Sequence, residues 1–339
     1  MTKRLLIRID SGFDVGHGHA VRVDGLLQSI ETPVQPVVWG DTTNLPGTLS
    51  GAETIEIKNL HPTDITAVRA DALLVDLPQR ANFPWALASR LGIPVIAIDD
   101  EGGDVEADLI VNPAAFDGSC RYRRAAPGTR FLRGPRYALV RPAFSVRSWR
   151  APLKKQILIV VGSGERAAGW ARKLLTAFPF DLQIDDCRIV VGAAFPDIGA
   201  FLVSARAAGI EVLQGIDALQ LAELMANASV ALVTGGMVVP EALTVGVPVI
   251  AFPQVESLVP EMQWLGSYGC IADLGFERGM DMDAVGHDLA ELIEDKDLAM
   301  RQSMLGRRLF DGSGMQRVAS AIDDVLAGRI ASVTAGAAV

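Results

Sequence analysis

The sequence predicts an α/β protein of two domains, each built on a parallel sheet that helices cover on both faces. Short, nearly continuous apolar runs alternate with helical stretches along the chain, which is typical of buried parallel strands. The succession of apolar strand, glycine turn and helix opens each half of the chain, first after Ile9 and again after Val161. With 339 residues, the chain is long enough for two ordinary domains and a large core.

The apolar runs give the expected order of elements in each domain. In the first half we expect strands at 5–9, 36–39, 72–76, 94–98 and 109–111, with a helix through Val23 and Ile30. In the second half we expect strands at 156–161, 188–192, 230–233 and 249–252. We expect helices at 167–178, 219–225, 282–293 and 297–326, and one more helix that begins at 240.

The segment 127–149 separates the two halves. It has two X-Pro steps and a basic cluster, so we expect an extended connector there. This gives a first domain at 1–149, a second at 150–326 and a loose tail at 327–339. We expect both domains to be Rossmann-like.

Composition excludes several classes of protein. The net charge of −9 argues against a general nucleic-acid binder, which needs a basic face. The most apolar region, 229–252, is interrupted by glycine, proline and glutamate, so no membrane span is expected. The start of the chain is predicted to be a strand and not a signal peptide, and its three cysteines are far apart. We therefore expect reduced thiols in a cytoplasmic protein, a monomer or weak dimer.

The stretch 10–22, DSGFDVGHGHAVR, is the first candidate site. Its glycines, which include Gly16 and Gly18, lie between a strand and a helix, where free backbone N–H groups and the helix dipole favour an anion. His17 and His19 lie in the same turn, and a histidine can accept a proton near neutral pH. A helix cap or a packing role is the alternative for each histidine. Val21 breaks the GxGxxG dinucleotide pattern.

Polar residues stand where several predicted strands end. Asp10, Asp76, Asp99 and Asn112 all follow or end an apolar run, and ligands of open parallel sheets bind at that edge. We expect Asp99 and Asn112 to be turn formers or helix caps. The acidic run 99–101 is expected to be a solvated loop, and neither a metal nor a cofactor is expected.

The second glycine turn, TGGMVVPEALTVGVP at 234–248, is the other candidate site. Gly235 and Gly236 place backbone amides before a helix, and Glu241 lies in its first turn. A buried carboxylate there can accept hydrogen bonds from both ribose hydroxyls, although pairing with the helix dipole is the alternative. The turn at 162–164, which contains Gly162 and Ser163, follows the first strand of this domain.

Three of these segments resemble a known family. The pattern D-x-G-x-x-x-G-x-G-H-x-x-R at 10–22 resembles the opening of the UDP-sugar hydrolases of the pseudaminic acid pathway and of related spore-coat polysaccharide proteins. The segment FLRGPRYALVRPAF at 131–144 is similar to their inter-domain segment. The second glycine turn resembles a nucleotide-binding motif that they share with the wider GT-B glycosyltransferases.

The resemblance implies a GT-B-like fold, with two Rossmann-like domains facing each other across a cleft. It implies hydrolysis of a UDP-linked, N-acetylated deoxysugar, with His19 as the base that activates water and UDP leaving with inversion. Arg22 is expected to pair with a phosphate or with a carboxylate such as Asp10. The candidate substrate- and nucleotide-binding residues are Asp10, Gly16, Gly18, Arg22, Asp76, Gly162, Ser163, Gly235, Gly236, Met237 and Glu241.

The chain also departs from the family pattern. Met237 and Val238 stand where a Ser or Thr hydroxyl usually meets phosphate, and Leu258 and Glu261 stand where the family has Gln and Asn. Leu77 replaces a tyrosine after Asp76, and His17 takes the position of a bulky residue that does not titrate. Two alternatives therefore stand beside the hydrolase. One is a glycosyltransferase of the same fold, and the other is a non-catalytic nucleotide-sugar-binding protein.

Overall fold

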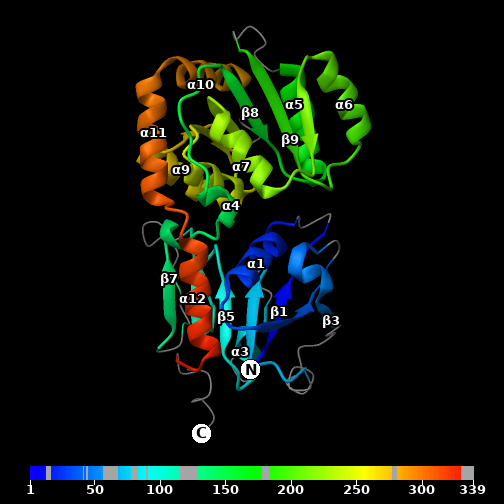
Figure 1. The fold of residues 1–339 in the computed structure, drawn as a ribbon, viewed down its shortest axis with the longest axis vertical. Coiled ribbons are helices and arrows are strands. Elements are labelled where there is room, and N and C mark those ends of the chain that lie inside the picture. The colour runs from blue at the N-terminus through cyan, green and yellow to red at the C-terminus, as the bar shows by residue number, and fades with distance from the viewer. Residues whose placement is uncertain are drawn as a thin grey trace. The chain divides into compact units, whose positions relative to one another are not determined.

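The computed structural model divides the chain into two compact units (Figure 1). The first comprises Met1–Leu139 and Ser313–Val339, and the second comprises Val140–Gly312. The structure describes residues 1–12, 17–40, 42, 45–55, 68–77, 83–88, 91–114, 122, 125, 128–177, 184–276 and 281–329.

The described part of the first unit is a seven-stranded parallel sheet with helices on its faces. Its strands lie in the order β3-β2-β1-β4-β5-β6-β7. They are β1 (Lys3–Ile9), β2 (Val34–Trp39), β3 (Glu53–Ile55), β4 (Ala72–Asp76), β5 (Val95–Ile98), β6 (Leu109–Asn112) and β7 (Arg130–Arg133). The helices are α1 (Gly18–Ser29), α3 (Trp85–Ala88) and α12 (Gly314–Leu326), with short 3-10 turns η1 (Gly47–Gly51) and η3 (Pro135–Tyr137).

The described part of the second unit repeats this architecture with six strands, in the order β10-β9-β8-β11-β12-β13. They are β8 (Gln156–Val160), β9 (Asp186–Val191), β10 (Glu211–Gln214), β11 (Val230–Thr234), β12 (Val249–Phe252) and β13 (Ala272–Asp273). The helices are α4 (Pro142–Ser145), α5 (Gly164–Ala177), α6 (Ile198–Ala207), α7 (Ala218–Asn227), α8 (Val238–Val245), α9 (Val259–Tyr268), α10 (Met282–Glu294) and α11 (Lys296–Leu309), with the 3-10 turn η4 (Glu256–Leu258).

Each sheet has one topological switch point. In the first unit the chain fills the sheet from β1 towards β3 and then returns to place β4 on the other side of β1. In the second unit the same reversal falls between β8 and β11. Loops that leave neighbouring strands in opposite directions open a crevice at the carboxyl ends of those strands, where ligands of such sheets bind.

The pleat of the first sheet separates its side chains into two cores. Leu74, Ile96 and Leu109 lie on the face that α1 and α12 cover. Leu73 and Val95, one residue away along their strands, lie on the opposite face. Since successive side chains of a strand alternate between faces, the register also decides which polar residues at the strand ends can meet.

The structure divides the chain differently from the sequence-based boundaries. The single helix expected at 297–326 is broken, because the chain turns at Gly312, which has a positive φ of 75°. The part after the break, α12, packs against α1, so it belongs to the first unit (Figure 1). Its apolar stripe, which includes Met315 and Ile322, completes the core of the first sheet.

The expected connector at 127–149 is also more regular than predicted. Arg130–Arg133 forms β7, the edge strand of the first sheet. Little in the sequence indicates this strand, because exposed arginines stand at both of its ends. The other missed strands, β3, β10 and β13, are two to four residues long and lack fully buried positions, so they have no continuous apolar run.

The remaining predictions agree with the elements observed. The strands predicted at 72–76 and 249–252 are found with those bounds, and the helix predicted at 282–293 is α10. Most of the predicted tail lies outside the described residues. Among the helices that the structure describes, none is both long and apolar enough to cross a membrane.

The position of α12 generates a testable prediction. Ile322 is fully buried in the first core, so Ile322→Ala should reduce the free energy of unfolding by about 2–5 kcal/mol. Gln316→Ala on the same helix is the matched control. Because Gln316 is exposed, its replacement should change stability by less than about 0.5 kcal/mol. Equal effects of the two substitutions in urea unfolding would contradict the packing of α12 on this sheet.

Candidate functional site

At the switch point of the first unit, a histidine and an aspartate meet. His19 lies in the first turn of α1, which is the helix that follows β1. Asp76 is the last residue of β4. The His19 Nδ1 atom lies 2.7 Å from Oδ1 of Asp76, which is fully buried. An ionised carboxylate only accepts hydrogen bonds, so the proton of a neutral His19 resides on Nδ1. The Nε2 lone pair is then left as the basic atom.

Arg22, one helical turn after His19, binds the same carboxylate. Its Nε donates to Asp76 Oδ2 at 2.6 Å and its Nη2 to Oδ1 at 2.5 Å. Its Nη1 and Nη2 also donate to Oδ2 of Asp100, at 3.0 and 3.1 Å. Arg22 is 9% exposed, so this is a largely buried charge cluster. The guanidinium is therefore engaged by two carboxylates.

The ionisation of this cluster follows from its charges. Burial by itself would raise the pKa of Asp76, but the charge and hydrogen bonds of Arg22 and His19 hold that pKa well below its usual range. Burial would likewise lower the pKa of Arg22, but Asp100 and Asp76 raise it above its usual range. Both side chains are consequently charged near neutral pH.

The prediction that Arg22 pairs with a carboxylate is confirmed, but its partners are Asp76 and Asp100 and not Asp10, which was the expected example. Asp10 is paired with Arg8, whose Nη2 donates to Asp10 Oδ2 at 3.1 Å. The Arg8 guanidinium also lies over the Trp39 ring, 5.2 Å from its centre, and Trp39 belongs to the core on the face away from α1. The strand pleat thus directs Arg8 and its partner away from Arg22.

The other residues of the first glycine turn have separate environments. His17 Nδ1 lies 2.9 Å from Oγ of Ser11, a buried residue that follows β1. Gly18 is the exposed first residue of α1, so its amide lies at the helix N-terminus. The predicted binding residue Gly16 lies outside the described residues.

Asp99 and Asn112 lie one register position beyond Asp76 and therefore face the opposite side of the sheet. Asp99 accepts hydrogen bonds from the backbone N–H groups of Glu101 and Gly102, which confirms its prediction as a turn former. The prediction of a solvated acidic loop is confirmed for Glu101, which is exposed. It is wrong for Asp100, which is paired with Arg22.

In the second unit, Glu241 is buried in the first turn of α8 and is paired with an arginine that the sequence analysis missed. Arg141 Nε and Nη2 donate to the two Glu241 carboxylate oxygens, at 2.7 and 3.1 Å. The Arg141 guanidinium also lies over the Phe144 ring. Burial raises the pKa of Glu241 above its usual range, although Arg141 acts in the opposite direction. The two residues are 100 positions apart, so no local pattern shows the pair.

The glycine turn before α8 supplies fewer free amides than predicted. The Gly235 N–H donates to the Phe252 carbonyl at 2.8 Å, so Gly235 extends the sheet and has no free N–H group. Gly236 has a positive φ of 87°, which turns the chain into α8. Within the described part of the chain, the N–H groups of Gly236, Met237 and Val238 have no hydrogen-bond acceptor.

The turn at 162–164 lies across the switch point from α8. The Gly162 carbonyl accepts a hydrogen bond from Gly192 N–H at 3.2 Å. The Ser163 Oγ lies where a side chain at Gly192 would begin, only 2.0 Å from such a Cβ position. The two loops therefore pack closely, and Gly162 and Ser163 stand at the carboxyl end of β8, beside the strand that carries Gly235.

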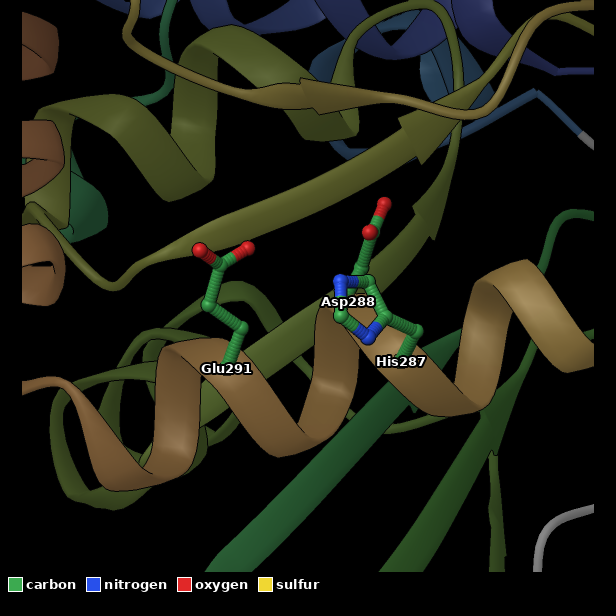
Figure 2. A group of neighbouring side chains, drawn as sticks. All are labelled: His287, Asp288 and Glu291. Carbon is green, nitrogen blue, oxygen red and sulfur yellow. The ribbon is translucent and has the colours of Figure 1, made fainter.

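Titratable groups elsewhere have simpler environments. Cys187 and Cys270 are free and buried, and burial raises the pKa of both thiols to about 12; Cys120 lies outside the described residues. Figure 2 shows His287, Asp288 and Glu291 on α10, a group whose ligand atoms lie within 4.8 Å of one another. His287 and Glu291 are exposed, as acidic helix faces commonly are, and we assign them no role in the site.

Comparisons with known proteins show the fold. No family model matches the sequence. The spore coat polysaccharide biosynthesis protein SpsG of Bacillus subtilis (strain 168) is 24% identical over 331 residues, which are 93% of this chain and 96% of the relative.

Three solved structures are similar over nearly their whole length. MurG of Acinetobacter baumannii has a TM-score of 0.67 and 15% identity, covering 95% of this chain and 99% of that one. MnaA of S. aureus with UDP has a TM-score of 0.62 and 14% sequence identity, and the match covers 96% of this chain and 97% of MnaA. The UDP-GlcNAc 2-epimerase of Neisseria meningitidis bound to UDP-GlcNAc has a TM-score of 0.56 and 11% sequence identity, and the match covers 96% of this chain and 99% of the epimerase. The predicted class, two Rossmann-like α/β domains of GT-B type, is thereby confirmed.

The buried pair of Asp76 and Arg22 predicts how stability depends on pH. Asp76→Asn should cost about 3–5 kcal/mol at pH 7, because Arg22 loses a buried partner. The folded pKa of Asp76 lies below the value of an unfolded chain, so its contribution is present above about pH 4 and is lost as the pH falls further.

The measurement is urea unfolding of both proteins between pH 7 and pH 3. The difference between wild type and Asp76→Asn should shrink below about pH 4. Glu53→Gln, which removes the exposed partner of Arg4 on the same sheet, should cost at most about 1 kcal/mol. A difference for Asp76→Asn that stays constant with pH would contradict the ionised pair.

Proposed function

We propose that this chain is a nucleotide-sugar hydrolase that releases UDP from a UDP-linked, N-acetylated deoxysugar. The observation that carries the proposal is the contact between His19 and Asp76 at the switch point of the first unit, which leaves Nε2 as a base. The sequence resemblance to UDP-sugar hydrolases and the similarity to a spore coat polysaccharide biosynthesis protein support a role in surface polysaccharide synthesis. We place this activity in the cytoplasm.

The reaction needs few groups from the protein. His19 Nε2 takes a proton from water while the water oxygen forms a bond to the anomeric carbon. The bond from that carbon to the phosphate oxygen breaks, and UDP leaves with the bonding electrons. Asp76 fixes the orientation of the imidazole and stabilises the positive charge that forms on it, as carboxylates do for catalytic histidines in other enzymes.

We assign the nucleotide to the second unit. The free N–H groups of Gly236, Met237 and Val238 suit a diphosphate without any side-chain hydroxyl, so the absence of Ser or Thr at 237 and 238 is compatible with phosphate binding. Glu241 is the proposed acceptor for the ribose hydroxyls, and Arg141 holds its carboxylate in place. Two similar structures contain UDP or UDP-GlcNAc, which supports UDP as the nucleotide.

A glycosyltransferase is the second candidate, and the fold supports it too. A glycotransferase of kitacinnamycin has a TM-score of 0.57 to this chain. In that reaction, an acceptor hydroxyl takes the place of water and gives its proton to the same Nε2 atom. The buried arrangement of His19, Asp76 and Arg22 weighs against a binding protein without activity, because nucleotide binding alone does not need an oriented base.

His19→Ala tests the base. Release of UDP from a panel of UDP-N-acetyl-deoxysugars should fall by about 10²- to 10⁴-fold, while UDP still binds. His287→Ala, at an exposed histidine of α10, is the control and should leave the rate unchanged. Release that needs an added acceptor would favour the transferase. UDP release that is equally fast in His19→Ala would contradict the assignment of the base.

Glu241→Gln tests the nucleotide site. Loss of charge-assisted hydrogen bonds to the ribose should weaken UDP binding by about 10- to 100-fold in calorimetry. Glu223→Gln is the matched control, since Glu223 is an exposed carboxylate that pairs with Arg147 in the same unit. Equal UDP affinity of all three proteins would contradict the role of Glu241.

A further inference from the structure

Gln254, the second residue after β12, carries a polar atom without a partner. Its side-chain Nε2 is buried and has no hydrogen-bond acceptor among the described residues, while the residue as a whole is half-buried. An amide N–H group that leaves water without finding a new acceptor is costly, because it loses hydrogen bonds to solvent and gains none. A donor that is kept for a ligand accounts for such a group.

The backbone of Gln254 is held from the far side of the neighbouring strand. Arg166, in the first turn of α5, donates a hydrogen bond from Nη1 to the Gln254 carbonyl. The helix α5 follows β8, Gln254 follows β12, and β11 lies between these two strands. The contact therefore bridges the loops on either side of the Gly235–Gly236 turn, which leaves the end of β11.

The loop after β12 also contacts this turn directly. The Gly235 N–H donates to the Phe252 carbonyl, and the Pro253 Cα atom lies 3.5 Å from the position of a Cβ on Gly235. Gln254 is the next residue after Pro253. Its side chain therefore begins beside the turn whose last residues carry the N–H groups that have no acceptor in the described part of the chain.

The hydrogen-bonding groups gathered here are donors. The Gln254 Nε2 and the backbone N–H groups before α8 suit a ligand group that only accepts hydrogen bonds, as an ionised phosphate oxygen does. Rotation of the Gln254 side chain towards the turn breaks no hydrogen bond of Nε2. Leu258, Met237 and Val238 have no side-chain donor of this kind, so Gln254 supplies one that these three positions lack.

We propose that Gln254 binds a phosphate oxygen of the nucleotide through Nε2, so that the loop after β12 and the turn before α8 hold the diphosphate together. The inference rests on the proposed function, which assigns the nucleotide to the second unit. A purely structural role for Gln254 would consist of packing its loop, and an apolar side chain of similar size would serve that role.

Gln254→Leu separates the two roles, because leucine fills a similar space and has no donor. In the free protein, the urea midpoint of unfolding should stay the same or rise, since a buried polar atom without a partner is removed. In calorimetry, UDP binding should weaken by about 10- to 100-fold, as expected for the loss of one hydrogen bond to a charged group.

Gln263→Leu is the matched control. Gln263 is an exposed glutamine of α9 in the same unit, so its replacement should leave UDP affinity unchanged. Gln254→Met takes the place of the leucine variant if circular dichroism shows that the latter is unfolded.

Uridine, UDP and inorganic pyrophosphate locate the contact. The loss in Gln254→Leu should appear with UDP and with pyrophosphate, whereas uridine affinity should not change. An equal loss for uridine overturns the phosphate assignment, because the donor would then contact the nucleoside.

The outcomes separate the inference from the function. Unchanged affinity for UDP and pyrophosphate in folded Gln254→Leu overturns the role of Gln254, while UDP release that depends on His19 would still support the hydrolase. If no UDP-sugar is hydrolysed, the proposed function fails, and the affinities for UDP and pyrophosphate still decide the role of Gln254. A wild-type protein that binds neither probe overturns both.

Discussion

The carboxylate of Asp76 is the group on which the candidate site depends. It is fully buried at the end of β4, where a free carboxylate would be costly, and it is tolerated because Arg22 and His19 both donate to it. Three consequences follow from these contacts. The first turn of α1 is tied to the neighbouring strand, the imidazole is oriented, and its Nε2 atom is left basic. Removal of Asp76 would affect stability and reactivity together.

Both units place polar groups at the switch point of a parallel sheet, but the groups differ in kind. In each sheet the chain reverses beside the first strand, and the loops after the two central strands carry the polar groups. In the first unit these groups are side chains, His19 and Asp76. In the second unit they are mainly backbone amides before α8, with the buried Glu241 and its partner Arg141 one turn further on. A proton acceptor needs a titratable side chain, whereas a diphosphate can be bound by amides alone.

The sequence predicted the elements of this site better than its contacts. Apolar runs located the central strands, and the glycine turns located the starts of α1, α5 and α8 within a few residues. Pairing was harder, because it depends on the pleat and on distant positions. Asp10 follows β1 and Asp76 ends β4, but only Asp76 faces α1. Arg22 lies 54 and 78 positions from its two partners, Asp76 and Asp100, and Glu241 lies 100 positions from its partner. No local sequence pattern can show pairs so far apart.

The departures from the family pattern have a physical reading in this fold. Leu258 packs against the glycine turn, with its Cδ1 only 3.3 Å from the position of a Cβ on Gly235. An apolar side chain there shields the turn but offers no hydrogen bond. Met237 and Val238 likewise offer no side-chain hydroxyl, while the N–H groups of Gly236, Met237 and Val238 have no acceptor among the described residues. In the proposed function the backbone N–H groups bind the diphosphate, and this binding needs no side-chain hydroxyl. Under the proposed function, the residues at 237, 238 and 258 bear on which groups of the ligand can be hydrogen-bonded, and His19 is the residue assigned to the chemistry.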